Sequence, residues 1–342
     1  MPAPLILALE TSCDETAGAI LGEGGEALAQ FVASQVDLHR AYGGVVPEVA
    51  CRAHMECLLP GVEGLLARAG IGPGELAAVA VTNRPGLIGA LLVGMSAAKA
   101  LALAWGKPLV GVDHLEAHVA AAGLACPGLA APYVALVASG GHSNLYLVRR
   151  EPPARGGMEP LAGTLDDAAG EAFDKAAKLL GLGFPGGPRI EAAAAGGDPR
   201  AFPWRNACLP PDGVNFSFSG LKTAVLRAAR GRAGRLGPLI LDGRGVTDAA
   251  ASFQEAVAHA LVSRTLAAAE RHRTEWVVLA GGVAANSLLR EKLSAGAAAR
   301  GMRTAIPPPA LCTDNAVMVA ARARALFAAG VRDGLDLEAA AR

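Results

Sequence analysis

The chain contains two similar runs of strand, polar turn and strand, and this repeat limits the folds open to it. In Leu5–Leu21, two apolar stretches flank the polar, acid-bearing turn Glu10–Thr16, and a third apolar stretch, Ala27–Ala33, follows. Tyr133–Arg149 has the same plan around the turn Ser139–Ser143. Short apolar runs separated by polar turns are typical of antiparallel strands. The repeat therefore predicts a duplicated architecture of two related halves, with a site between them.

Length and composition place the chain among compact globular proteins. Its 342 residues are enough for two domains with sizeable cores, and 52% of them are hydrophobic against 18% charged. Aromatic residues make up only 4%, so small aliphatic side chains must fill the cores by close helix–sheet packing. The formal net charge is zero, so a nucleic-acid partner would need a local basic patch or a helper protein.

Cysteine usage and hydropathy favour a reducing compartment and no membrane. The six cysteines form no C-x-x-C pair and no framework spacing, and the N-terminus has no signal-peptide pattern, so we expect free thiols in the cytoplasm. The longest apolar run, Gly86–Trp105, contains Ser96, Lys99 and several glycines. We expect it to be a buried helix rather than a membrane span.

Two buried strands are each followed by candidate ligand-binding residues. Pro108–Val112 leads to His114, and Trp276–Ala280 leads to the glycine pair of Gly281–Asn286. In open α/β sheets ligands bind at the carboxyl ends of strands, and a glycine pair between a strand and a helix N-terminus is a typical phosphate position. The pattern is not G-x-G-x-x-G, so it indicates a phosphate or nucleotide without indicating a dinucleotide fold.

The segment His114–His118 offers a pair of metal ligands. It continues into valine and alanines without a breaker and is predicted to be helical. Residues i and i+4 lie on one helix face about 6 Å apart, so both imidazoles can reach one zinc or iron ion. Glu116 lies on roughly the opposite side of the helix, unlike the glutamate that follows the first histidine in zincin peptidases. Two histidines at a helix surface or domain interface are the open alternative.

Acidic residues near two further helix starts have a structural explanation beside a functional one. Asp166, Asp167 and Glu171 fall in the first turns of a predicted helix, where the helix dipole favours carboxylates. Thr313 and Asp314 are predicted to cap the last helix. Asp314 is also a candidate third, oxygen ligand for a metal.

A glycine-rich turn and an arginine-rich segment are the remaining candidates. Adjacent glycines bracketed by prolines in Gly183–Glu191 make a rigid turn whose backbone N–H groups can approach a ligand, although a plain tight loop has the same composition. The densest basic stretch fits either a solvated face or contact with phosphate backbone. Its arginines are Arg227, Arg230, Arg232, Arg235 and Arg244.

Eight short motifs occur in order along the chain from Leu5 to about Leu326. They are Glu10-Thr-Ser-Cys-Asp-Glu-Thr, His114-Leu-Glu-Ala-His, Ala138-Ser-Gly-Gly-His, Leu165-Asp-Asp-Ala-Ala-Gly-Glu-Ala-Phe-Asp-Lys, Phe184-Pro-Gly-Gly-Pro, Asn215-Phe-Ser-Phe-Ser-Gly-Leu-Lys-Thr, Gly281-Gly-Val-Ala-Ala-Asn and Thr313-Asp-Asn-Ala. Together they closely resemble the TsaD family, the bacterial tRNA N(6)-adenosine threonylcarbamoyltransferases, formerly described as sialoglycoprotein endopeptidases. Each motif alone is moderately specific, whereas eight in register are very specific.

The resemblance implies an α/β fold and a metal centre. The fold is the actin-like ATPase fold of sugar kinases and heat-shock chaperones, with two ribonuclease-H-like lobes around a cleft. We expect residues 1–112 plus about 315–342 to form the N-terminal lobe, and residues 113–314 to form a C-terminal lobe that carries most metal and nucleotide contacts. The implied cofactor is one divalent metal ion per subunit, Fe²⁺ or Zn²⁺, held by His114, His118 and Asp314.

Substrate contacts also follow from the resemblance. Asp14 matches an acidic position thought important for activity in the family, and we take it as the candidate catalytic residue. The implied substrate-binding residues are Val137, Ala138, Ser139, Gly140, Gly141, Asp174, Gly187, Glu191 and Asn286.

Two positions depart from the family pattern. Arg84 precedes Pro85-Gly86 where relatives usually have glycine, so that loop is expected to differ in shape or charge. Ser143 stands where threonine is common and keeps the hydroxyl. Neither position is one of the implied metal ligands.

The family reaction moves a threonylcarbamoyl group from threonylcarbamoyl-adenylate to the N(6) amine of the adenosine 3′ of the anticodon, in tRNAs that read ANN codons, and releases AMP. The donor is a mixed anhydride, so the reaction needs orientation and positive charge near the developing oxyanion rather than a covalent enzyme intermediate. A His/His/Asp metal with open coordination positions can act as the Lewis acid. Our hypothesis is that the metal binds the threonylcarbamoyl part and the glycine loops bind the adenylate.

The implied partners are tRNA, threonylcarbamoyl-adenylate, the helper proteins TsaB and TsaE, and a TsaC or Sua-type synthase that supplies the adenylate, with no membrane. Three alternatives stay open at this point. They are a metallopeptidase, an ATP-dependent small-molecule kinase of the same fold, and a non-catalytic nucleotide-binding scaffold of the chaperone type.

Overall fold

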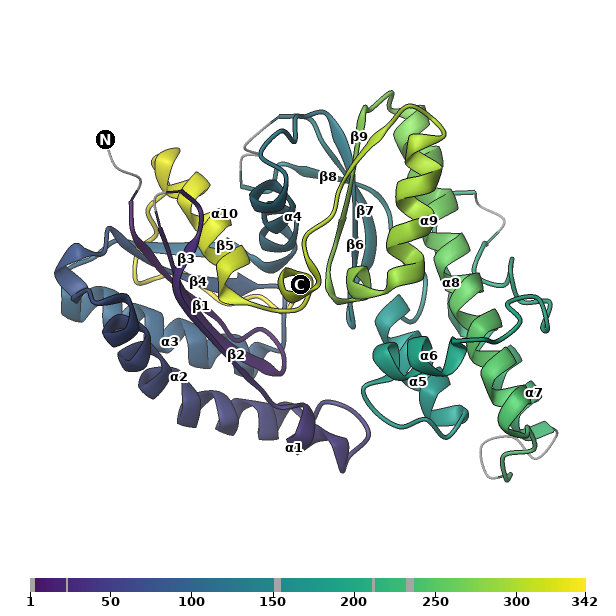
Figure 1. Ribbon diagram of the computed structural model, residues 1–342. Coiled ribbons are helices and arrows are strands. Elements are labelled where there is room, and N and C mark those ends of the chain that lie inside the picture. The colour runs from purple at the N-terminus through teal and green to yellow at the C-terminus, as the bar shows by residue number, and fades with distance from the viewer. Residues whose placement is uncertain (1–3, 23, 151–154, 211–212, 232–236) are drawn as a thin grey trace. The chain divides into compact units, whose positions relative to one another are not determined.

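The chain forms two compact units, which we describe one at a time. The computed structural model describes residues 4–22, 24–150, 155–210, 213–231 and 237–342 (Figure 1). Unit 1 consists of Met1–Pro127 and Thr313–Arg342, and unit 2 of Gly128–Cys312. Unit 1 is therefore built from both ends of the chain.

Unit 1 is built on a five-stranded mixed sheet with the order β3-β2-β1-β4-β5. β1 pairs antiparallel with β2 and parallel with β4, so the predicted N-terminal meander forms half of the sheet. The central strand is buried on both faces, which explains its uninterrupted apolar sequence. The strands are β1 (Ile6–Glu10), β2 (Glu15–Leu21), β3 (Ala27–Ser34), β4 (Ala78–Arg84) and β5 (Leu109–Asp113).

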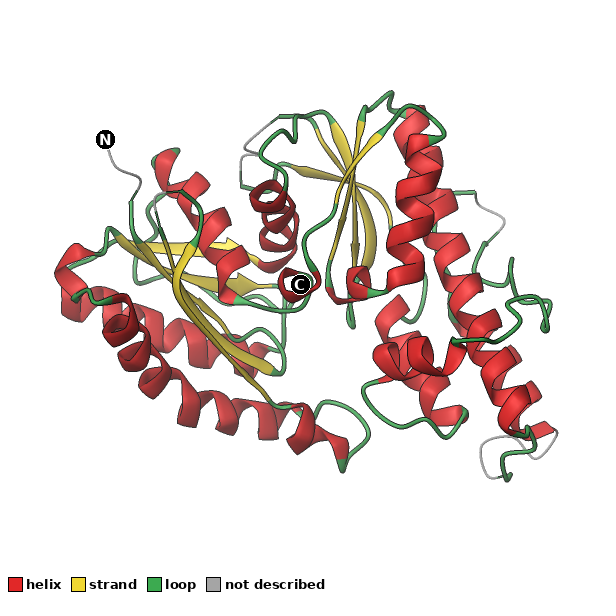
Figure 2. Ribbon diagram, viewed as in Figure 1, coloured by secondary structure: helices red, strands yellow, loops and turns green. Residues whose placement is uncertain are grey.

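Helices cover both faces of this sheet. α2 and α3 pack against each other and against β2 and β4, while α10 packs against β1, β2 and β5 together with α4 (Figures 1 and 2). α2 begins with proline at its first position and ends at Gly70 with φ = 67°, which are favoured start and stop residues. The helical segments of unit 1 are α1 (Val36–Arg40), α2 (Pro47–Ala69), η1 (Pro73–Glu75), α3 (Ile88–Trp105), α4 (His114–Ala125) and α10 (Ala316–Ala328).

The apolar helix α3 is by length and composition long enough to cross a membrane, and it is the one such helix in the described ranges. Its small side chains face the rest of unit 1: Ala90, Gly94 and Ala98 are buried where the helix packs on α2 and β4. Leu92 and Leu103 on its other side are exposed. The predicted helix is confirmed, but only one of its faces is buried.

Unit 2 is built on a second five-stranded sheet, with the order β10-β9-β6-β7-β8. β6 pairs antiparallel with β7 and parallel with β9. The strands are β6 (Tyr133–Ala138), β7 (Ser143–Val148), β8 (Met158–Ala162), β9 (Trp276–Ala280) and β10 (Arg303–Ala305).

The helices of unit 2 surround a single large core. α8 lies along β6 and β9 and packs against α6, α7 and α9, and α5 packs against α6 and α7. Alanines at half of the buried positions of α8 allow this close approach. The helical segments are α5 (Ala169–Leu179), α6 (Gly186–Ala194), α7 (Ser219–Arg230), α8 (Gly243–Arg271), η3 (Gly282–Ala285), α9 (Ser287–Ala298) and η4 (Pro309–Leu311).

The two sheets have the same topology, which confirms the predicted duplication. In each, a three-stranded antiparallel meander is extended by two parallel strands, and the first meander strand is central. Strand for strand, β6, β7, β8, β9 and β10 repeat β1, β2, β3, β4 and β5. This is the order expected for two ribonuclease-H-like lobes.

The observed boundary between the units differs from the predicted one. The sequence placed residues 113–314 together in the second lobe, whereas α4 and Asp314 belong to unit 1. The physical reason is that α4 packs along α10, which itself lies on the first sheet. The three candidate metal ligands therefore lie in unit 1 rather than in unit 2.

Asp166 and Asp167 do not lie in the first turn of a helix, because α5 begins only at Ala169. Asp166 instead accepts hydrogen bonds from the backbone N–H groups of Phe218 and Ser219 at the start of α7, 2.7 and 3.2 Å long. Asp167 pairs with Lys222 of the same helix at 2.7 Å. The two aspartates thus attach α7 to the loop that leads into α5.

Candidate metal centre and glycine-rich loops

The histidine-bearing helix α4 begins directly at the end of β5. Asp113, the last residue of β5, caps the helix by accepting hydrogen bonds from the N–H groups of Leu115 (2.9 Å) and Glu116 (3.2 Å). Arg84, the departure from the family pattern, lies 3.2 Å from the other carboxylate oxygen of Asp113. The arginine therefore pairs with the cap of α4, in the part of unit 1 where β4 and β5 end together.

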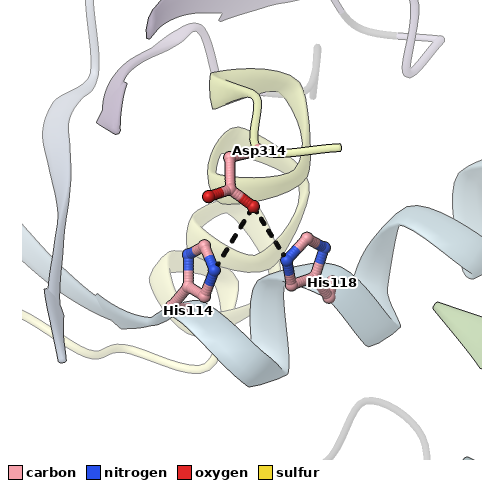
Figure 3. Close-up of side chains that lie close together, drawn as sticks. All are labelled: His114, His118 and Asp314. Carbon is pink, nitrogen blue, oxygen red and sulfur yellow. Dashed lines mark ion pairs between the residues drawn. The ribbon is translucent and has the colours of Figure 1, made fainter. Parts of the chain in front are cut away.

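Three predicted ligands converge in unit 1: His114, His118 and Asp314. Their ligand atoms lie within 4.8 Å of one another. Asp314 Oδ1 is 3.5 Å from His114 Nε2 and 3.2 Å from His118 Nε2, and the two imidazole rings are edge to face with centroids 4.6 Å apart. Figure 3 shows both rings on the same side of α4, facing the carboxylate that precedes α10.

A buried carboxylate, to which the sequence assigned no role, contacts the Nδ1 nitrogen of His114. Glu10 Oε2, at the end of β1, lies 3.0 Å from His114 Nδ1. Burial opposes the charged forms of both groups, but the Glu10 and Asp314 carboxylates raise the pKa of His114 to about 9, and His114 lowers the pKa of Glu10. The raised pKa favours the protonated ring, so a metal that binds at His114 competes with a proton.

His118 is fully buried, and neither of its ring nitrogens makes a hydrogen bond among the described residues. Asp314 is close to Nε2 but outside hydrogen-bonding geometry. Burial lowers the pKa of His118, and the charge on His114 lowers it further, against the raising effect of Asp314. Burial therefore favours the neutral imidazole, which is the form that binds a metal.

The donor set and its surroundings fit a divalent metal ion of the zinc or iron kind. Two imidazoles and one carboxylate are ligands that both metals accept, and three protein ligands leave further positions open. A buried imidazole without hydrogen bonds is costly unless something else satisfies it. A metal coordinated at one ring nitrogen of His118 would remove part of that cost.

Asp314 is not the helix cap that the sequence predicted. Asn315 caps α10 by accepting a hydrogen bond from the N–H of Met318 at 2.9 Å, and its own amide donates to the carbonyl of Thr313 at 2.8 Å. The cap lies one residue later because the helix starts at Ala316. Asp314 is thereby directed toward the two histidines.

Glu116 points away from the histidine pair, as its place on the helix predicts. Its carboxylate forms a buried ion pair with Arg322 of α10, with nitrogen–oxygen distances of 2.9 and 2.7 Å. Both side chains are nearly inaccessible. A carboxylate engaged in this way is not placed to activate water at the cluster, which removes the main feature of a zincin-type peptidase.

Asp14, the candidate catalytic residue, follows β1 in the turn that leads to β2, and its neighbour is Glu15. Burial raises the pKa of Asp14, and the charge of Asp314 adds to this effect. Burial also raises the pKa of Glu15 to about 7. Glu15 Oε1 accepts a hydrogen bond from Ser34, while Oε2 is buried with no hydrogen-bond partner in the described structure.

In unit 2, the predicted substrate-binding stretch Val137–Gly141 is the end of β6 and the following turn. The N–H of Ser139 donates to the carbonyl of His142 at 2.7 Å and so closes the turn. The carbonyl of Ser139 accepts from the N–H of Gly170 at 3.1 Å, which joins the turn to the start of α5. Ala138 belongs to β6, and Gly140 is the exposed tip.

Three further predicted contacts of unit 2 lie on α5, on α6 and at the cap of α9, and each has an internal partner. Asp174 of α5 accepts a hydrogen bond from the N–H of Gly186 at 2.6 Å, at the start of α6. Glu191 of α6 accepts from the N–H of Ser287 at 3.0 Å. Asn286, which caps α9, donates to Gln254 at 2.8 Å. These bonds join α5, α6 and α9 next to one another.

Glycines on these loops fall into two groups that differ in their surroundings. Gly281 has φ = 89°, and a β-carbon there would clash with the carbonyl oxygen of Ala138, so the fold itself requires glycine. Gly140, Gly141, Gly187 and Gly282 have no such φ, and a β-carbon at each would meet nothing within 4 Å. Neither the backbone conformation nor crowding requires glycine at these four positions. Close approach of a ligand to the backbone would account for glycine there.

The arginine-rich segment is only partly available for an external partner. Arg230 donates to the carbonyl of Gly237, and Arg244 pairs with Asp248. Arg227 is exposed near the end of α7. Arg232 and Arg235 lie outside the described residues.

Sequence reasoning missed Glu10 and the groups that hold it, Ser12 and Thr82. The available signal was an acidic residue directly at the end of an apolar strand, where a charge is costly unless paired. Thr82 belongs to a different strand, and nothing in the sequence shows that β1 and β4 are neighbours.

Comparison with known proteins places the chain in one family. The sequence model of TsaD, tRNA N6-adenosine threonylcarbamoyltransferase, matches residues 26–321. The chain belongs to the TsaD family. It is 53% identical over 335 residues to the tRNA N6-adenosine threonylcarbamoyltransferase of Symbiobacterium thermophilum, covering 98% of this chain and 95% of that protein. The protein of the same name from Anaeromyxobacter dehalogenans strain 2CP-1 is 52% identical, with 98% and 97% covered.

Solved structures support the fold at low sequence identity. HypF of T. kodakarensis is similar over 96% of this chain and 48% of its own, with a TM-score of 0.60 at 16% identity. Component A of the (R)-2-hydroxyglutaryl-CoA dehydratase of Acidaminococcus fermentans is similar over 95% and 98%, with a TM-score of 0.54 at 16% identity. The chain thus has the α/β, actin-like ATPase fold expected from the sequence.

Proposed function

We propose that this chain is a tRNA N(6)-adenosine threonylcarbamoyltransferase. It would transfer the threonylcarbamoyl group of threonylcarbamoyl-adenylate to the N(6) amine of the adenosine 3′ of the anticodon, in tRNAs that read ANN codons. The observation that carries this proposal is the full-length similarity to proteins of that name, at about half of all positions identical. The chemistry of the residues in both units agrees with it.

The reaction replaces one bond to the carbamoyl carbon by another. The N(6) nitrogen forms a bond to that carbon, the bond from the carbon to the phosphate oxygen breaks, and AMP leaves with the electron pair. The amine must also lose a proton. Asp14 is our candidate acceptor because burial raises its pKa and so makes it a stronger base than an ordinary aspartate.

We assign the metal ligands to His114, His118 and Asp314, with one Fe²⁺ or Zn²⁺ per subunit. When bound, the metal would supply Lewis-acid stabilisation of negative charge that develops on the carbamoyl group. The convergence of the three ligand atoms and the unsatisfied imidazole of His118 support this assignment.

Residues of unit 2 would bind the adenylate. Val137, Ala138, Ser139, Gly140 and Gly141 offer backbone groups at the end of β6 and the following turn. Gly187 offers a further backbone position at the start of α6, where the helix dipole favours phosphate. Asp174, Glu191 and Asn286 hold the neighbouring loops in place and would present their remaining acceptors and donors to ribose or base.

The partners would be tRNA, the helper proteins TsaB and TsaE, and a TsaC or Sua-type synthase as the source of the adenylate, all in the cytoplasm. Support for helpers comes from the zero net charge, which makes unaided tRNA binding weak. Arg227 is our candidate for a direct phosphate contact by this chain.

The proposal is tested by incubating the protein and helpers with unmodified tRNA and threonylcarbamoyl-adenylate, and digesting the tRNA to nucleosides. We expect threonylcarbamoyl-adenosine, and stoichiometric AMP. Phosphorylation of a small molecule by ATP would favour a kinase, and cleavage of a casein-type substrate that His118→Ala abolishes would favour a peptidase. Adenylate binding without transfer would favour the non-catalytic nucleotide-binding scaffold.

A further inference from the structure

A buried chain of polar contacts ends at the side of His114 that faces away from Asp314 and His118. Glu10 Oε2 lies 3.0 Å from His114 Nδ1, and Glu10 is 1% exposed. Both carboxylate oxygens have further donors: Thr82 Oγ1 donates to Oε2 at 2.6 Å, and the N–H of Ser12 donates to Oε1 at 2.6 Å. The carboxylate is therefore fixed in position from β4 and from the turn that follows β1.

The chemistry of the contact determines which ring nitrogen carries a proton. An ionised carboxylate only accepts hydrogen bonds, so His114 Nδ1 must be the donor. The lone pair that can bind a metal is then confined to Nε2, which is the nitrogen that faces Asp314 and His118. Ser12 Oγ lies 3.2 Å from the same Nδ1 and limits rotation of the ring.

We infer that Glu10 is a positioning residue for the metal centre: it holds His114 with Nδ1 protonated and Nε2 directed at the shared ion, and Thr82 and Ser12 hold Glu10. A carboxylate that accepts a hydrogen bond from the non-ligating nitrogen of a histidine ligand raises the basicity of the ring and fixes its orientation. His118 has no such partner, since its Nδ1 is buried without a hydrogen bond in the described structure. The two histidines thus differ: the fold fixes the orientation of the His114 ring for metal binding, whereas the Nδ1 of His118 has no such contact among the described residues.

The test measures binding of Co²⁺, a probe with visible absorption bands, to metal-free wild type and variants by competition with a chromophoric chelator. In Glu10→Gln the side-chain amide can adopt two orientations. In one, its NH₂ group donates to His114 Nδ1, which moves the ring proton to Nε2. In the other, its NH₂ group faces the N–H of Ser12, so that two donors oppose each other. We expect about 10–100-fold weaker binding and altered Co²⁺ bands. Thr82→Val should weaken Co²⁺ binding less than Glu10→Gln does. Thr82→Ser keeps the hydroxyl and should bind Co²⁺ as wild type does.

Thr16→Val is the matched control. Thr16 Oγ1 lies 2.8 Å from Nδ1 of His54, a fully buried histidine of the same unit that is not part of the cluster. This substitution removes a similar buried hydrogen bond to an imidazole, so it should lower the melting temperature without changing Co²⁺ affinity. Equal loss of affinity in Thr16→Val and Glu10→Gln would mean that Glu10 acts only through general stability and would overturn the inference.

The inference rests on the proposed metal site, and the outcomes separate the two. Wild type that binds no Co²⁺ would overturn both. Wild type that binds tightly, with Glu10→Gln within twofold of it and with the same spectrum, would overturn only the role of Glu10. If Glu10→Gln does not fold, Thr82→Val against Thr82→Ser decides, since identical affinities for these two would also contradict the inference.

Discussion

His118 differs from the other histidines of unit 1 in having no hydrogen bond on either ring nitrogen within the described structure. His54, for comparison, lies within hydrogen-bonding distance of Thr16 and of the carbonyl of Cys13. A buried polar group without a partner destabilises a fold, so its presence is best explained by a function. Together with His114 and Asp314 it gives the cluster the composition of a metal centre.

Replacing His118 by alanine should abolish metal binding and transfer while leaving the fold intact. We expect at least about a hundredfold loss of metal affinity, because one of three protein ligands is removed. His259→Ala serves as the control, because this half-buried imidazole of α8 lies outside the cluster. Metal content by mass spectrometry of the native protein checks the prediction; a His118→Ala protein that keeps its full metal load would contradict it.

Glu15→Gln should change the pH dependence of stability. The pKa of Glu15 is raised to about 7, so the folded state holds a proton that the unfolded chain releases at lower pH. The resulting stabilisation is complete below the ordinary glutamate pKa and is lost as the pH rises through about 7. The variant should match wild type at pH 4 and be more stable at pH 8.5, by urea denaturation. A constant difference across this range would contradict the shift.

At the scale of elements, the attachment of α7 depends on Asp166. Its carboxylate accepts hydrogen bonds from the backbone of Phe218 and Ser219 and from the hydroxyls of Ser217 and Ser219. These bonds are nonlocal in sequence and satisfy donors at the start of the helix. They explain why the motifs at 165–175 and 215–223 occur together in the chain.

Asp166→Ala should lower the free energy of unfolding by roughly 1–3 kcal/mol, the usual cost of removing a charged acceptor from donors that stay behind. Glu159→Ala removes the exposed pair with Arg149 and is expected to cost less than about 1 kcal/mol. Urea titrations of both variants provide the comparison. Equal effects would mean that Asp166 does no more than an ordinary surface carboxylate.

The unit 2 glycines at which a β-carbon would meet no other atom lead to a prediction about substrate binding rather than about stability. Gly140→Ala places a methyl group where nothing lies within 4 Å, so the fold should tolerate it. If the adenylate approaches this backbone, the KM for threonylcarbamoyl-adenylate should rise about tenfold, which corresponds to about 1.4 kcal/mol of binding. Gly128→Ala, also in open space but before β6 rather than in the turn after it, should leave KM unchanged. An unchanged KM in Gly140→Ala would remove this turn from the binding site.

Much of the fold followed from local sequence, and the site followed less completely. The apolar runs gave the first meander, the hairpin of β6 and β7, and the strands β5 and β9, because buried strands must be apolar. The third strand of the second meander, β8, was not predicted. The cap of α10 and the start of α5 were misplaced by one to several residues, since side-chain hydrogen bonds rather than hydrophobic patterning decide them. The pairing of Glu10 with His114 joins residues from distant parts of the chain, and spacing alone cannot predict it.

At the scale of the whole molecule, tRNA binding is expected to depend on local rather than net charge. Arg227→Glu should weaken tRNA binding at low salt and reduce the slope of log affinity against log salt by about 1 or more. Arg149→Glu, at an exposed position directly after β7 of the same unit, is the charge-matched control. If both variants show the wild-type salt slope, Arg227 is not a phosphate contact.

The central claim is that transfer of threonylcarbamoyl to tRNA by this chain needs the metal at His114, His118 and Asp314. The most direct measurement digests tRNA to nucleosides after incubation with helpers and threonylcarbamoyl-adenylate, using chelator-stripped protein, the same protein reloaded with Fe²⁺ or Zn²⁺, and His118→Ala treated alike. We predict threonylcarbamoyl-adenosine only with reloaded wild type. Full product from stripped protein, or no product from reloaded wild type with helpers of proven activity, would contradict the account.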